Sequence, residues 1–211
     1  MRRCAPLLLP LAVLFLVPVV LPAQQDVPDA LQAYRESRHQ DAIAITRDEI
    51  EANPNNIESY VVLGWALNAL NRRQEAIDSS LRALQINQFE SRVLQIIAEA
   101  HYYSGNRLEA LRYLERYVRV APAGQYIDWV YYAMGEILID FGEYHRADIA
   151  LTTAVYHNAR SAPRWARLGY AREQLREWQA ALAAYDRALQ LNPNLADAVA
   201  GRDRVRAALE G

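Results

Sequence analysis

Residues 162–195 read APRWARLGYAREQLREWQAALAAYDRALQLNPNL, and this stretch decides the fold. Two small residues, Gly169 and Ala181, stand twelve positions apart, and Pro193 follows twelve positions after Ala181. Small side chains at facing positions let two helices pack closely, and a proline ends the second helix. The stretch therefore predicts a helical hairpin that turns near Arg176.

The same pattern recurs through the chain. The alanine that opens the second helix of each hairpin recurs at intervals of 34, 34, 37 and 34 residues, as Ala42, Ala76, Ala110, Ala147 and Ala181. The small residue twelve positions earlier recurs as Ala30, Gly64, Ala98, Gly135 and Gly169. The expected turns, where a left-handed backbone favours Gly or Asn, fall at Ser37, Asn71, Gly105, Gly142 and Arg176. A period of this length predicts an α-solenoid of stacked helix pairs.

These residues resemble the tetratricopeptide consensus. The fifth unit matches it most fully, through Trp165, Leu168-Gly169, Ala181, Tyr185 and Ala188. The resemblance implies an all-α fold, a right-handed superhelix of antiparallel helix pairs closed by a capping helix. In order along the chain, we expect units at approximately 27–56, 57–90, 91–124, 125–161 and 162–195, and the capping helix at 196–209.

Two local features of the sequence add detail to this arrangement of repeats. The fourth unit is preceded by three extra residues, Gln125-Tyr126-Ile127, which we expect to add one turn to its first helix. Asn194 stands just before the capping helix, where an asparagine side chain can cap the first backbone N–H groups.

The first 23 residues have the three-part plan of a secretory signal peptide. Arg2 and Arg3 give a positive start, residues 7–21 are apolar, and Ala23 precedes a polar stretch. We expect cleavage after Ala23, which leaves one tetratricopeptide domain at 24–211 and an exported, periplasmic protein. The alternative is an uncleaved N-terminal anchor, because the 20 residues from Cys4 to Ala23 are just long enough to span a bilayer.

Composition excludes several classes of chemistry from the mature chain. There is no lysine, and the single cysteine, Cys4, lies in the leader, so Schiff-base and thiol chemistry have no residue to use. Without Arg2 and Arg3, 21 arginines stand against 25 acidic residues, a balance that does not favour nucleic acid. The four histidines show no metal-ligand spacing, and no glycine-rich phosphate loop occurs. We therefore expect no enzyme activity, no metal and no cofactor.

The resemblance places binding on the concave face, which the first helices of the family's repeats line. Carried over by position, the expected groove is aromatic and acidic, and suits an extended segment with apolar and basic side chains. A clamp for a terminal carboxylate, as in chaperone-binding members, is disfavoured because Arg92 and Arg167 would stand among glutamates. The predicted groove residues are Trp65, Gln95, Glu99, Tyr102, Tyr103, Trp129, Tyr132, Glu136, Tyr170 and Glu173.

The sequence thus predicts a non-catalytic protein–protein interaction scaffold of the cell envelope. We expect its partner to be a protein or peptide and not a nucleic acid. We expect no membrane contact unless the N-terminal segment remains uncleaved as an anchor. A second hypothesis stays open, in which the protein is a membrane-tethered accessory subunit that docks by its convex face.

Overall fold

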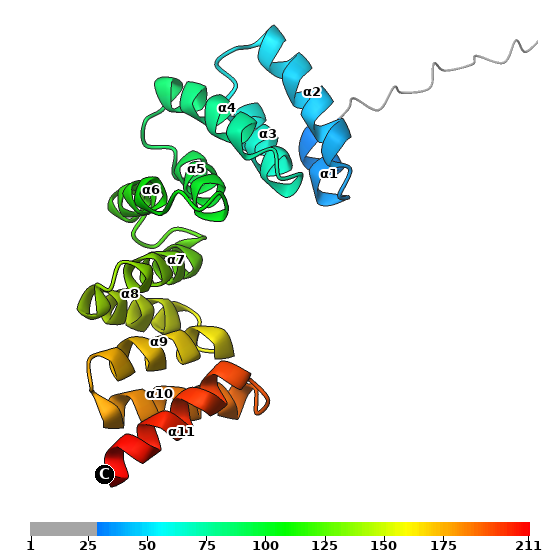
Figure 1. Cartoon of the computed structure of the whole chain (residues 1–211). Coiled ribbons are helices and arrows are strands. Elements are labelled where there is room, and N and C mark those ends of the chain that lie inside the picture. The colour runs from blue at the N-terminus through cyan, green and yellow to red at the C-terminus, as the bar shows by residue number, and fades with distance from the viewer. Residues whose placement is uncertain (1–28) are drawn as a thin grey trace, which may run out of the picture.

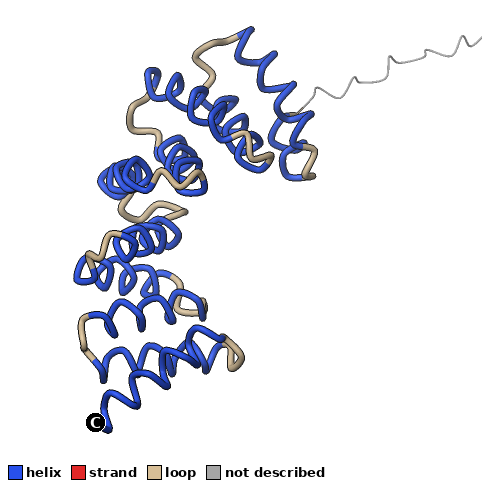
Figure 2. Tube along the Cα trace, in the orientation of Figure 1, coloured by secondary structure: helices blue, strands red, loops and turns tan. Residues whose placement is uncertain are grey.

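A computed structural model describes residues 29–211, and the predicted signal peptide lies outside that range. Over the described range the chain forms α-helices and no strand, arranged as hairpins that follow one another along a curved path (Figures 1 and 2). The helices are α1 (Ala30–Arg35), α2 (His39–Ala52), α3 (Ile57–Ala69), α4 (Arg73–Ile86), α5 (Ser91–Tyr103), α6 (Arg107–Val120), α7 (Ile127–Asp140), α8 (Tyr144–His157), α9 (Ala162–Gln174), α10 (Trp178–Leu191) and α11 (Ala196–Glu210).

The periodic small residues form the seams between helices, which confirms the predicted all-α solenoid. All five alanines that open the second helices, from Ala42 to Ala181, are fully buried. At Gly135, a Cβ atom would lie 2.5 Å from Leu151 Cγ, so the close approach of α7 and α8 depends on this glycine. The buried apolar residues form three clusters along the solenoid, and partly buried side chains such as Trp165 pack against two of them.

The five predicted turn residues all have a left-handed backbone. Their φ angles lie between 59° and 79°, and three of the five positions are not glycine: Ser37, Asn71 and Arg176. Asparagine tolerates this region, but arginine and serine carry a steric cost there. The turn geometry was therefore set by the repeat, even where the residue type does not favour it.

Replacing Arg176 with glycine is expected to stabilise the protein by about 0.5–1 kcal/mol, because the strain at a positive φ exceeds the entropy that glycine adds to the unfolded chain. The reciprocal change, Gly142→Arg, has open space around its Cβ and should cost a similar amount. Thermal unfolding of both variants checks the pair. Equal midpoints for wild type and Arg176→Gly would contradict the strain argument.

The three extra residues before the fourth unit do not add a helical turn, so that prediction was wrong. Helix α7 has 14 residues against 13 in α5, and the preceding loop spans residues 121–126. The loop forms a second turn, in which Ile127 N donates to Gly124 O at 3.0 Å. The hydroxyl of buried Tyr117 accepts from Tyr126 N at 3.1 Å, which holds the added residues in the loop.

The expected cap of α11 was also wrong. The N-cap residue is Leu195, and Asn194 lies one position too early for its side chain to reach the first helical N–H groups. Its backbone N–H instead donates to Asn192 Oδ1 at 3.2 Å, as part of the turn that follows α10. Helix α11 is held by packing on α10 and α9, through buried Ala198, Gly201 and Val205.

Candidate functional site

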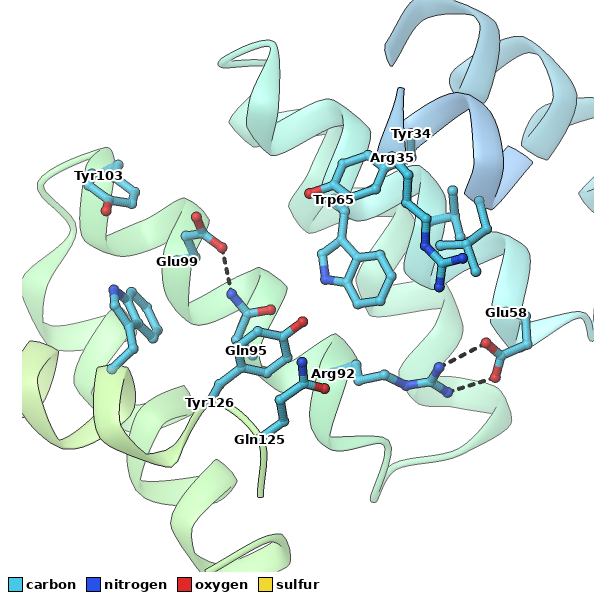
Figure 3. Close-up of a pocket in the computed structure, with 13 residues that line it drawn as sticks. Tyr34, Arg35, Glu58, Trp65, Arg92, Gln95, Glu99, Tyr103, Gln125 and Tyr126 are labelled. Atoms are coloured by element: carbon cyan, nitrogen blue, oxygen red, sulfur yellow. Dashed lines mark hydrogen bonds and ion pairs between the residues drawn. The ribbon is translucent and has the colours of Figure 1, made fainter. Parts of the chain in front are cut away.

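The first helices of the N-terminal units surround a hollow of about 750 Å³, here called the inner hollow (Figure 3). Helices α1, α3, α5 and α7 contribute to it, and the loop 121–126 adds one side. Its lining residues are Leu31, Tyr34, Arg35, Glu58, Val62, Trp65, Arg92, Gln95, Glu99, Tyr103, Gln125, Tyr126 and Trp129.

Half of the predicted groove residues line this hollow. They are Trp65, Gln95, Glu99, Tyr103 and Trp129. The other five lie outside it, on α5, α7 and α9, and arginines of the same chain contact all of them: Tyr102, Tyr132, Glu136, Tyr170 and Glu173. The structure therefore divides the predicted groove into an N-terminal part that lines the inner hollow and a C-terminal part that is paired within the chain.

Aromatic side chains form the walls of the inner hollow. Tyr34 and Trp65 lie with ring centroids 5.7 Å apart, tilted by 30°. On the facing side, Trp129 meets the edge of Tyr102 at 6.1 Å, and Tyr102 in turn meets Tyr103 at 5.1 Å. Rigid aromatic surfaces of this kind offer large contact area at little cost in rotamer entropy.

The polar part of the hollow centres on Glu99 and Gln95, one helical turn apart on α5. Gln95 is 5% exposed, and its Nε2 donates to Glu99 Oε2 at 2.5 Å. The amide oxygen of Gln95 is buried and has no hydrogen-bond partner among the described residues. Buried acceptors are nearly always satisfied in native proteins, so this one requires an explanation.

Burial raises the pKa of the Glu99 carboxyl, although the hydrogen bond from Gln95 and the charge of Arg73 act in the opposite direction. No ion pair joins Glu99 to a cation within the described residues. The ionised carboxylate is consequently held in a costly environment.

Replacing Glu99 with glutamine is expected to raise stability at neutral pH. A carboxyl with a raised folded-state pKa destabilises the protein above that pKa, and the cost disappears as the pH falls below the usual value of 4.5. We expect a gain of about 1 kcal/mol at pH 7.5, roughly 2–4 °C in melting temperature, and convergence of the two proteins near pH 4. Thermal unfolding at the two pH values measures this, and a lower melting temperature of the variant at pH 7.5 would refute it.

The other two glutamates of the predicted groove are paired with arginines of the chain, although burial still raises the pKa of Glu136 against the opposing effect of Arg167. Glu136 accepts a hydrogen bond from Arg167 Nε. Glu173 accepts Arg204 Nε at 2.7 Å and Nη2 at 2.9 Å. Burial would raise the pKa of Glu173, but Arg204 and the Tyr185 hydroxyl outweigh it, and this pKa lies below its usual range.

Arginines also cover the aromatic rings in the C-terminal part. Arg107 stands 4.6 Å from the Tyr102 ring centroid, Arg164 stands 5.6 Å from that of Tyr132, and Arg167 stands 5.3 Å from that of Tyr170. Each contact is of the cation–π type and reduces the ring face left for a partner.

The two basic candidates for a carboxylate clamp are committed to glutamates. Arg92 donates to Glu58 at 2.7 and 2.8 Å and to Glu90 at 2.9 Å, while Arg167 pairs with Glu136. Neither guanidinium is left to hold the terminal carboxylate of a peptide.

Sequence reasoning missed Tyr34, Gln125 and Tyr126. Tyr34 lies on the six-residue helix α1. Gln125 and Tyr126 belong to the three-residue insertion, which marks a departure from the repeat and could have pointed to them. A residue inserted between units has no counterpart in the consensus, so carrying positions over from the family cannot place it.

Residues 29–211 contain no group of three or more His, Cys, Asp or Glu side chains able to hold a metal ion. None of the helices described has both the length and the apolar character that crossing a bilayer requires.

Solved structures with the same architecture have low sequence identity to this chain. MamA from Desulfovibrio magneticus RS-1 is 17% identical with a TM-score of 0.69, and covers 79% of this chain and 93% of its own. YrrB, a TPR protein with an unusual peptide-binding site, is 19% identical with a TM-score of 0.72, over 78% and 84%. PilF from Pseudomonas aeruginosa is 16% identical with a TM-score of 0.73, over 86% and 81%. At these identities the likeness concerns the fold.

No curated protein sequence matches the chain. Two stretches match family models described as the tetratricopeptide repeat, residues 57–89 and residues 162–195. The first covers α3 and α4, and the second covers α9 and α10, so each match falls on one complete hairpin of the solenoid. The chain belongs to the tetratricopeptide-repeat family.

Proposed function

We propose that this protein is an exported, non-catalytic scaffold that binds an extended segment of a partner protein in the inner hollow. Tetratricopeptide repeats serve as modules for protein–protein interaction, and YrrB is a relative in fold with a peptide-binding site. The observation that carries the proposal is the hollow itself. Its volume of about 750 Å³ falls within the range of roughly 300–1,000 Å³ that is usual for ligand sites, and its walls are aromatic.

The alternative, docking by the outer face, has one observation in its favour. Ile149 and Tyr156 on α8 are 67% and 83% exposed, and they lie seven residues apart on the same helix. Two turns of a helix bring such residues to one face. This pair is small for an interface, and it lacks the hollowed shape and buried polar groups of the inner surface.

Paired variants separate the two surfaces. Trp65→Ala with Trp129→Ala removes two walls of the hollow, and Ile149→Ala with Tyr156→Ala removes the exposed pair on α8. We expect the first double variant to lose capture of the partner from an envelope extract by 100-fold or more, since buried aromatic anchors dominate binding energy. The second should capture the partner as wild type does. Loss confined to the α8 variant would move the site to the outer face and refute the proposal.

Export is tested separately. We expect the mature protein to begin at Gln24 and to fractionate with the periplasm. An intact N-terminus in the membrane fraction would favour the tethered accessory subunit instead.

A further inference from the structure

Glu99 and Glu136 hold the same position in successive repeats, but only one of them has a cation. Each directly follows the small residue of its first helix, Ala98 and Gly135. Glu136 is paired with Arg167, which lies two positions before the small residue of the next unit, Gly169. The residue that corresponds to Arg167 one repeat earlier is Ala133, which cannot supply a charge to Glu99.

The repeat that contains Glu136 therefore shows which group the repeat that contains Glu99 lacks, namely an arginine that pairs with the glutamate. Arg167 donates from Nε to Glu136 while its guanidinium stands 5.3 Å from the ring centroid of Tyr170. A carboxylate beside an aromatic face suits a guanidinium in particular, since the planar group can stack and donate hydrogen bonds at once. In the inner hollow the carboxylate and the aromatic faces are present, but none of the described arginines pairs with that carboxylate.

No cation of the described residues forms an ion pair with Glu99. Arg35 on α1 lines the hollow, but it is not joined to this carboxylate by a hydrogen bond or an ion pair. Arg73 donates to Asn71 Oδ1 at 2.8 Å and stands 5.8 Å from the Tyr103 ring centroid, and it does not pair with Glu99. Arg92 is held by Glu58 and Glu90, as described above.

Glu99 faces into the hollow and not into the protein core. Its side chain lines the hollow together with those of Tyr34 and Tyr126. Burial raises the pKa of the two tyrosine hydroxyls, and the charge of Glu99 raises both further. In Figure 3 the Gln95 side chain lies between Glu99 and Tyr126.

Gln95 supplies a second, independent indication of a missing donor. Its Nε2 faces Glu99, so its oxygen is directed away from that carboxylate, and this oxygen is buried without a partner. An arginine side chain carries five N–H donors, enough to serve both Glu99 and Gln95.

We propose that the inner hollow binds an arginine side chain of the partner segment, with Glu99 and Gln95 as acceptors and the rings of Trp65 and Trp129 as walls. This inference rests on the proposed function and names the chemistry of its partner. The guanidinium of the bound segment pairs with Glu99 as Arg167 pairs with Glu136. Because the hollow is much larger than one side chain, the rest of it accommodates neighbouring residues of the segment.

The test begins with selection of random 12-residue peptides on the purified protein. We expect the selected peptides to share an arginine at one position. A selected peptide is then synthesised with an acetylated N-terminus, and again with that arginine replaced by citrulline, which has nearly the same shape and no charge. We expect the citrulline peptide to bind about 10–100-fold more weakly, as measured by calorimetry, the usual effect of losing a charged hydrogen-bonded pair.

A double-mutant cycle connects the peptide's arginine to Glu99. Glu99→Gln should weaken the arginine peptide by a similar factor while binding the citrulline peptide as wild type does. Because this variant is expected to be at least as stable as wild type, its loss of binding cannot be ascribed to unfolding. Glu177→Gln, at an exposed turn far from the hollow, provides the matched change of charge and should leave both affinities within about threefold.

The outcomes separate the inference from the function on which it rests. Peptides selected without arginine, peptides that share a lysine instead, or a cycle without coupling would overturn the arginine site while leaving a peptide-binding hollow. Failure to select any peptide, or selected peptides that bind equally to the Trp65→Ala/Trp129→Ala variant, would overturn the proposed function as well.

Discussion

Replacing Tyr185 with alanine is expected to lower the free energy of unfolding by roughly 3–5 kcal/mol, the range for deleting a buried aromatic side chain. Tyr185 on α10 is only 1% exposed, and its ring lies between two glycines of neighbouring helices. A Cβ atom at Gly169 of α9 would stand 2.8 Å from Tyr185 Cδ1, and one at Gly201 of α11 would come still closer to the ring. Alanine at position 185 would leave this space empty unless the helices moved together.

The hydroxyl of the same residue ties three helices together. It donates to Glu173 Oε2 on α9 at 2.6 Å, and Glu173 accepts Arg204 of α11 through both of its oxygens. The ring and the hydroxyl therefore both stabilise the packing of α11 against the last hairpin, which α9 and α10 form. Because each unit of a solenoid contacts only its neighbours, the loss should be concentrated in α9, α10 and α11.

Tyr185→Phe is the matched control. It keeps the ring between the two glycines and removes only the hydrogen bond to Glu173, whose charge Arg204 still neutralises, so we expect a loss of about 1 kcal/mol. Urea denaturation gives the two free energies, and hydrogen exchange shows which helices open. Equal losses for both variants would mean that the hydroxyl network, and not the packing of the ring, holds α11 in place.

The seams of the fold could be predicted from sequence because they depend on local size. A small residue such as Ala42 or Gly135 marks where two helices touch, and the turn at Arg176 is left-handed although arginine gives no sign of it. These features could be placed because the same spacing recurs in five units, so each position is supported by the pattern as a whole and not by one residue. The insertion at 125–127 was misjudged because its fate depends on Tyr117, nine residues upstream of Tyr126, whose hydroxyl accepts a hydrogen bond from the loop.

The candidate site was predicted only in part, for a physical reason. Family positions show which side chains face inward, but not which of them are already paired. The pairs Arg167–Glu136 and Arg204–Glu173 join residues 31 positions apart, and they depend on the rotation from one unit to the next. Of the three glutamates predicted for the groove, Glu99 alone has no arginine partner among the described residues.

Replacing Asp128 with alanine is expected to lower the free energy of unfolding by roughly 2–3 kcal/mol, the second large effect. The reason is that a charged hydrogen-bond partner is left unsatisfied. Asp128 lies in the first turn of α7, and its Oδ2 accepts Arg164 Nη1 of α9 at 2.7 Å and Asn158 Nδ2 at 3.1 Å. The Arg164 side chain is only 11% exposed, so its charge has little access to water once Asp128 is gone.

Dependence on pH identifies the charge of Asp128 as the cause. Burial alone would raise the pKa of this carboxyl, but the hydrogen bonds from Arg164 and Asn158 outweigh burial and hold the pKa below its usual value of 3.8. A lowered pKa contributes stability that is fully present above 3.8 and is lost as the pH falls through the folded-state value. The advantage of wild type over Asp128→Asn, which has the same shape and no charge, should thus be complete at pH 7 and shrink below pH 3.8. If the difference in unfolding free energy between these two proteins stayed constant from pH 7 down to pH 2, the loss would come from the changed hydrogen-bond geometry, and the ion pair between α7 and α9 would contribute nothing.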